Sequence, residues 1–102
     1  MNETPQRDWR QAVITDPLGL HLRPAARLVS LARSFRSEIR VLCRGNAANG
    51  KSILDLVSLA AECGTMLDVI AHGPDAQEAV AALTGSILAG LDGSVGQGAA
   101  AA

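Results

Sequence analysis

The stretch DPLGLHLRPAARLVSLA, residues 16–32, joins a Pro/Gly turn to a run of helical periodicity at a single histidine, His21. Apolar residues after it recur at intervals of three and four, which predicts an amphipathic helix from Leu22 onward. Pro24 fits a helix only in the first turn, where its missing N–H breaks no helical hydrogen bond. The proline therefore places His21 at the N-cap of this helix.

The segments on either side alternate between strand and helix patterns. Residues 38–44 and 66–72 alternate between apolar and polar side chains, as half-buried strands do. Together with the patterns of the remaining segments, these two runs predict four strands and three helices. The strands are expected at 9–15, 38–44, 46–49 and 66–72, and the helices from 22, over 52–63 and over 76–91. The order β-α-β-β-α-β-α with short connections favours an α+β fold, in which one antiparallel sheet carries its helices on one face. Periodicity does not give the strand order.

Composition limits the classes of function. The chain has 102 residues, 9 basic and 10 acidic, and only 2% aromatic residues, which argues against nucleic-acid binding. No apolar run approaches the length of a membrane span, and the polar start is unlike a signal peptide, so we expect a cytoplasmic protein. We expect a flexible leader at 1–8, one domain at 9–91 and a disordered Gly/Ala-rich tail at 92–102.

The start of the first helix is suited to an anion. The N–H groups of Leu22 and Arg23 have no helical acceptor, and the helix dipole adds positive potential beside His21. Arg23 adds a planar set of donors, and the positive surroundings favour a neutral imidazole, which can accept and release a phosphoryl group. The competing interpretation is a plain polar cap, although histidine is a poor N-cap.

Two segments carry a resemblance to a known family. GLHLRPAARLV, residues 19–29, resembles the active-site segment of the HPr family, the histidine-containing phosphocarriers of the phosphoenolpyruvate-dependent phosphotransferase system. NGKSILDLVSLAAECGTMLDVIAHGPDAQEAVAAL, residues 49–83, resembles the second and third helix region of that family. The resemblance spans roughly residues 10–91 and implies an open-faced β-sandwich, with a four-stranded antiparallel sheet and three helices on one face.

The resemblance also implies roles for individual residues. His21 would accept a phosphoryl group on Nδ1 from phosphorylated enzyme I and donate it to an enzyme IIA-type domain. Leu22, Arg23 and Pro24 would form the phosphate site, and Ser52 aligns with the serine that an HPr kinase/phosphorylase modifies. We expect a monomer that acts as a stoichiometric intermediate, without metal or organic cofactor.

The sequence departs from the common family pattern at two places. Leu22 stands where the sugar-uptake proteins often have a small residue, and Asp55 stands where they often have glycine. KSILDLVSLAAECGT, residues 51–65, is closer to the nitrogen-related branch, so sugar uptake and nitrogen regulation both stay open.

Apolar side chains around the histidine suggest a transient docking surface. The expected docking residues are Leu20, Arg27, Lys51, Ile53 and Leu54. Ser52 also has a structural interpretation, because with Asp55 it resembles a capping box for the second helix.

Two other functions are weighed against the carrier. A binding module of the same fold could act through phosphorylated Ser52 without any phosphorelay. A phosphatase or phosphotransferase for small molecules would need an acid or base facing His21 and a pocket for its substrate. His72 has no flanking donors, Cys43 and Cys63 are expected to be small buried residues, and their spacing does not suit a metal.

Overall fold

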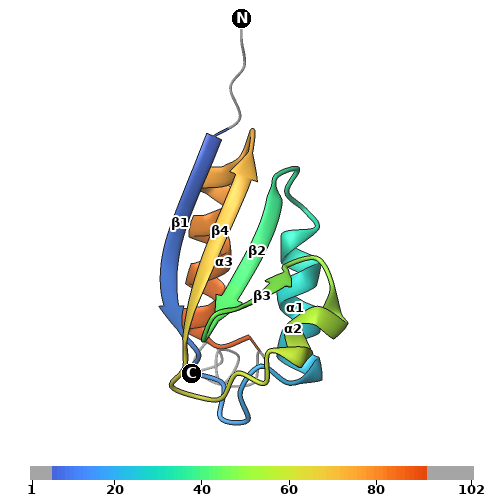
Figure 1. The fold of residues 1–102 in the computed structure, drawn as a ribbon, viewed down its shortest axis with the longest axis vertical. Coiled ribbons are helices and arrows are strands. Elements are labelled where there is room, and N and C mark those ends of the chain that lie inside the picture. The colour runs from blue at the N-terminus through green and yellow to red at the C-terminus, as the bar shows by residue number, and fades with distance from the viewer. Residues whose placement is uncertain (1–5, 92–102) are drawn as a thin grey trace, which may run out of the picture.

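The computed structural model describes residues 6–91 and contains a four-stranded antiparallel sheet with three helices on one of its faces (Figure 1). The elements, in chain order, are β1 (Gln6–Val13), α1 (Leu22–Ala32), β2 (Glu38–Cys43), β3 (Asn46–Asn49), α2 (Ile53–Ser58), β4 (Met66–Gly73) and α3 (Ala76–Ala89). The βαββαβα order and the one-sided helix layer confirm the predicted α+β, open-faced architecture.

The strands lie in the order β1-β4-β2-β3, so β4 has a neighbour on each side. Ile70 lies opposite Trp9 of β1 and Arg40 of β2, which fixes the register of the three strands. Alternate β4 residues, Leu67, Val69 and Ala71, are fully buried under the helices. The other face of the sheet has no helix over it among the described residues.

The helices and the inner face of the sheet share one core. α3 packs on β1 and β4, while α1 contacts α2 and α3. Aliphatic side chains and alanines fill this core, and its largest fully buried hydrophobic members include Ile14, Leu28, Ile39, Leu56, Leu67, Leu83 and Ile87. In the part of the chain that the structure describes, no helix is long and apolar enough to cross a membrane.

The first strand begins earlier than the sequence indicated. β1 starts at Gln6 and ends at Val13, whereas the pattern predicted residues 9–15. Residues 6–8, which were expected in a flexible leader, therefore belong to the sheet, where Gln6 lies opposite Gly73. Residues 1–5 and the expected tail at 92–102 lie outside the described residues.

The second helix is shorter than predicted. α2 ends at Ser58, although apolar spacing continues to Cys63, because the backbone enters the left-handed region at Ala60, with φ of +53°. Cys63 consequently lies in an exposed turn, which corrects the expectation that it is buried, while Cys43 is buried as predicted.

Asp75 joins two elements that are distant in sequence. It is the N-cap residue of α3, but its carboxylate accepts hydrogen bonds from the Ser37 hydroxyl and from the backbone N–H groups of Arg36 and Ser37. These donors, the Ser37 hydroxyl first, lower the pKa of Asp75 from 3.8 to about 2. The carboxylate therefore fastens the segment before β2 to the start of α3.

Candidate functional site

The loop before α1 is fastened to the loop before β4 by backbone hydrogen bonds. The N–H of Leu20 donates to the carbonyl of Ala61 at 2.8 Å, and the N–H of Gly64 donates to the carbonyl of Ile14 at 2.8 Å. Asp16 is buried, and its carboxylate accepts a hydrogen bond from the N–H of Leu91 at 2.9 Å. The segment that carries the histidine is thus held at both ends.

Gly19 allows these two loops to approach closely. Its φ is +76°, and a Cβ at this position would overlap the carbonyl oxygen of Ala61 and lie 2.9 Å from Cα of Glu62. Only glycine combines this backbone conformation with the absence of a side chain. The residue two positions before His21 therefore fixes how the histidine meets the neighbouring loop.

His21 occupies the predicted N-cap of α1. Its backbone is extended, its carbonyl accepts the N–H of Ala25 at 2.9 Å, and its half-buried imidazole forms no capping hydrogen bond. The N–H groups of Leu22 and Arg23 have no acceptor among residues 6–91, and Pro24 is buried in the first turn. An imidazole and two uncommitted amides therefore lie at one positively polarised helix end.

Arg23 extends from the same end of the helix into solvent. Its guanidinium forms no ion pair or hydrogen bond within the described part of the chain, and the same holds for Arg27 one turn later. The sequence predicted Arg23 as a phosphate-binding residue and Arg27 as a docking residue. The structure leaves Arg23 free to contact an external anion and Arg27 free to contact a partner.

The histidine borders a small open hollow of about 240 Å³. Its lining residues are Leu18, Leu20, His21, Val57, Ala60, Ala61 and Glu62. This volume is below the roughly 300–1,000 Å³ of typical ligand pockets, so the site suits contact with another macromolecule better than enclosure of a small substrate.

Glu62 is a member of this hollow that sequence reasoning missed. Its backbone N–H donates to the Thr65 hydroxyl at 3.2 Å. The preceding residue, Ala61, accepts the hydrogen bond from the N–H of Leu20. The sequence carries no local signal for this placement, because Glu62 joins the hollow only through the contact between the two loops.

The expected docking residues differ in exposure. Leu54 is 77% exposed and Ile53 half-buried, but Leu20 is only 3% exposed and packs in the core. This corrects the expectation that Leu20 presents its side chain to a partner. Leu18 and Leu22, 79% and 63% exposed, supply the apolar surface instead.

Lys51 and Ser52 already have contacts within the chain. The Lys51 ammonium donates to the carbonyl of Phe35 at 2.8 Å, and the Ser52 hydroxyl accepts the N–H of Asp55 at 3.2 Å. The Asp55 carboxylate accepts the N–H of Asn49 rather than completing a reciprocal capping box. Ser52 is therefore the N-cap of α2.

The remaining candidates lie apart from His21. His72 is exposed near the end of β4, opposite Arg7 and Glu38 in the sheet. No group of three or more potential metal ligands occurs among the residues that the structure describes.

Comparison with known proteins agrees with this geometry. The family model described as the PTS HPr component phosphorylation site matches residues 9–88. The chain is 44% identical over 75 residues to the phosphocarrier protein HPr of Buchnera aphidicola, covering 74% of this chain and 85% of that protein. It is 42% identical over 71 residues to the HPr of Vibrio cholerae, covering 70% and 84%.

A solved structure shows the same arrangement. HPr-C-His from Thermoanaerobacter tengcongensis superposes with a TM-score of 0.77 at 35% identity, covering 80% of this chain and 92% of that one. The residues that the family model matches, 9–88, include His21 and the two loops that meet beside it. The chain therefore belongs to the HPr family of phosphocarrier proteins of the phosphotransferase system.

Proposed function

We propose that His21 is the residue that carries the phosphoryl group, received from phosphorylated enzyme I and passed to an enzyme IIA-type domain. The observation that carries this proposal is the half-buried imidazole, free of capping bonds, beside two uncommitted amides and an unpaired arginine. In the first transfer, a lone pair on Nδ1 forms an N–P bond as the bond from phosphorus to the donor breaks. The donor group leaves with the electron pair of its broken bond to phosphorus. In the second transfer a group of the acceptor attacks phosphorus, and Nδ1 leaves with the electron pair of the N–P bond.

The surroundings of His21 stabilise the charge that moves. The amides of Leu22 and Arg23 lie at the positive end of α1, where a phosphoryl oxygen finds donors already in place. The Arg23 guanidinium offsets charge on the oxygens, and Pro24 sets the helical φ of the first turn without a competing N–H. Positioning and charge stabilisation are the main demands of phosphoryl transfer.

The surface around the site supports transient docking of both partners. Leu18, Leu22 and Leu54 expose apolar surface, and Arg27 adds positive charge along α1. A carrier must release each partner quickly, which a small interface permits. We propose that one copy of the chain is sufficient for the transfer, because His21 and the amides of Leu22 and Arg23 are consecutive at one helix start.

We propose that the relay operates in the cytoplasm, where Cys43 and Cys63 would stay reduced. Sugar uptake and nitrogen regulation are both compatible with this site. The choice between them depends on which IIA-type domain accepts the phosphoryl group.

Phosphorylation of Ser52 by an HPr kinase/phosphorylase stays a prediction from family resemblance. The hydroxyl of Ser52 caps α2, and a phosphate there would lie close to the Asp55 carboxylate. We therefore assign Ser52 a capping role. A regulatory binding module that acts through phosphorylated Ser52, without phosphorelay, is the second candidate function.

A relay assay tests the proposal. The chain is incubated with enzyme I and phosphoenolpyruvate, and then with a sugar-type or a nitrogen-type IIA domain. We expect acid-labile phosphate on the chain that moves to one of the two acceptors. His21→Ala should accept none, while the matched control His72→Ala should behave as the unaltered chain. Equal labelling of the chain and His21→Ala would refute the assignment of His21.

A further inference from the structure

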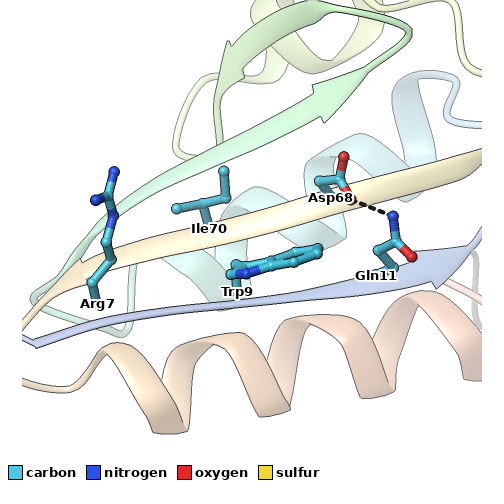
Figure 2. A pocket seen from close by; sticks show the side chains of 5 residues that line it. All are labelled: Arg7, Trp9, Gln11, Asp68 and Ile70. Atoms are coloured by element: carbon cyan, nitrogen blue, oxygen red, sulfur yellow. Dashed lines mark hydrogen bonds between the residues drawn. The ribbon is translucent and has the colours of Figure 1, made fainter.

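The face of the sheet opposite the helices carries three transverse rows of side chains. The pairing of β4 with β1 and β2 defines them as Arg7–His72–Glu38, Trp9–Ile70–Arg40 and Gln11–Asp68–Leu42. Figure 2 shows Arg7, Trp9 and Gln11 of β1 beside Asp68 and Ile70 of β4, on the side of the strands away from α3. We call these three rows the open face.

The centre of the open face is apolar and uncovered. Trp9, the only tryptophan of the chain, is 56% exposed, and it lies opposite the half-buried Ile70. Two hollows of about 570 and 390 Å³ flank this pair, and both include Arg7 and Ile70. An exposed aromatic and aliphatic centre with a charged rim is typical of a protein-contact surface.

The charges around this centre are of both signs. Arg7 forms no ion pair among residues 6–91, while Arg40 and Glu38 form one at 3.4 Å with both side chains more than half exposed. Such an exposed pair is weak and can exchange partners. A nucleic acid or an anionic membrane would instead require a surface of one sign. Mixed charge around an apolar centre fits a second copy of the same surface.

We propose that the open face pairs with the open face of a second copy, forming a weak two-fold dimer whose axis runs parallel to β4. A rotation by a half turn about this axis leaves each row at the same position along β4. It places β1 of one copy opposite β2 of the other copy, because these two strands flank β4. Arg7 then faces Glu38 of the other copy, and Trp9 faces Arg40 of the other copy. Ile70 meets its own counterpart at the centre.

The contacts suit the reach of these side chains. Packed sheets lie about 10 Å apart, a gap that an arginine and a glutamate can bridge together. Arginine over an indole ring adds a cation–π contact on each side of the axis. A two-fold axis across the strands would instead place Arg40 against Arg40, so charge complementarity favours the axis along β4.

The dimer should be weak and leave the relay site open. The open face is three strands wide, with about 4.8 Å between strands, and three rows long, with about 6.8 Å between rows. Its area is therefore much less than the roughly 800 Å² that each partner buries in a standard interface. The seven residues that line the hollow at His21 do not include any residue of the open face. This pairing therefore goes beyond the proposed function and does not depend on it.

Sedimentation equilibrium on the full chain, from about 10 μM to about 1 mM, tests the pairing in the range expected for an interface below standard size. We expect the average mass to rise with concentration toward that of two chains, with a parallel change in Trp9 fluorescence. Arg7→Glu and Glu38→Arg should each weaken association on the order of tenfold or more, because each places like charges face to face. The double variant should restore association, since it exchanges the two charges.

Glu78→Arg, on the exposed side of α3, is the matched control and should leave association unchanged. A chain that stays monomeric throughout would overturn the proposal. So would a dimer that both single variants leave intact, because another surface, such as an exchanged strand, would then form it. Failure of the double variant to restore association would also count against the predicted Arg7–Glu38 contact.

Discussion

At the scale of single residues, the site depends on groups that the fold leaves without partners. The amides of Leu22 and Arg23 and the guanidinium of Arg23 have no acceptor in the described part of the chain, and the His21 ring does not cap its helix. Gly19 has the opposite role, because it makes the close contact with Ala61 that holds the loop in place. Free groups provide the chemistry, and tightly constrained groups position them.

Arg23→Ala should slow phosphorylation of the chain on the order of 100-fold, as loss of a charge-stabilising donor does at other transfer sites. The side chain is exposed and unpaired, so the stability of the fold should not change. Quenched-flow measurement of transfer from enzyme I checks this, with Arg33→Ala as the control at the other end of α1. Equal slowing in both variants would indicate a general effect of charge.

Gly19→Ala should destabilise the domain by more than about 1 kcal/mol, because the new methyl group meets the Ala61 carbonyl in a left-handed backbone conformation. The matched control is Gly85→Ala in α3, where nothing lies within 4 Å of the added Cβ. That change should stabilise the domain by about 0.5–1 kcal/mol. Urea unfolding of both variants measures the difference, and two changes of the same sign would contradict the account of Gly19.

At the scale of elements, strands and helices were predictable where one side faces the core. β2, β4 and α3 have regular apolar spacing, and the structure buries the expected side chains Ile39, Val69 and Leu83. The start of β1 lacks this pattern, because Arg7 and Trp9 lie on the uncovered face and pairing with β4 holds the strand. The left-handed backbone at Ala60 also ends α2 where the sequence did not indicate it, since alanine and leucine spacing alone would continue the helix.

Asp75 should make the link between the β2 segment and α3 sensitive to acid. Because folding lowers its pKa from 3.8 to about 2, its contribution is complete above pH 3.8 and is lost as the pH falls through about 2. Asp75→Asn should therefore lower the urea midpoint near neutral pH, and the difference from the unaltered chain should shrink in that acidic window.

Ser37→Ala provides a second test of this link, because it removes the hydroxyl that contributes most to the lowered pKa of Asp75. NMR titration of this variant should find the pKa of Asp75 moved back toward 3.8. A urea-midpoint difference for Asp75→Asn that stays constant down to pH 2 would show that the carboxylate charge is not involved.

At the scale of the whole molecule, the two faces of the protein differ in what covers them. The helices cover one face of the sheet, and His21 lies at the N-terminal end of one of them, α1. Trp9 and its neighbours lie on the other face (Figure 1, Figure 2). The local sequence predicted His21, Leu22, Arg23 and Pro24 together, because they are consecutive at one helix start. It could not predict Glu62 or the burial of Leu20, because both follow from how two distant loops pack.

The central claim is that His21 bears the phosphoryl group and that the adjacent amides bind its oxygens. NMR of the ¹⁵N-labelled chain, before and after phosphorylation by enzyme I and phosphoenolpyruvate, tests both parts together. We predict coupling of phosphorus to a ring nitrogen of His21, with the largest backbone amide shifts at Leu22 and Arg23. Phosphorus on His72 or another residue, or unchanged amides at Leu22 and Arg23, would contradict the account.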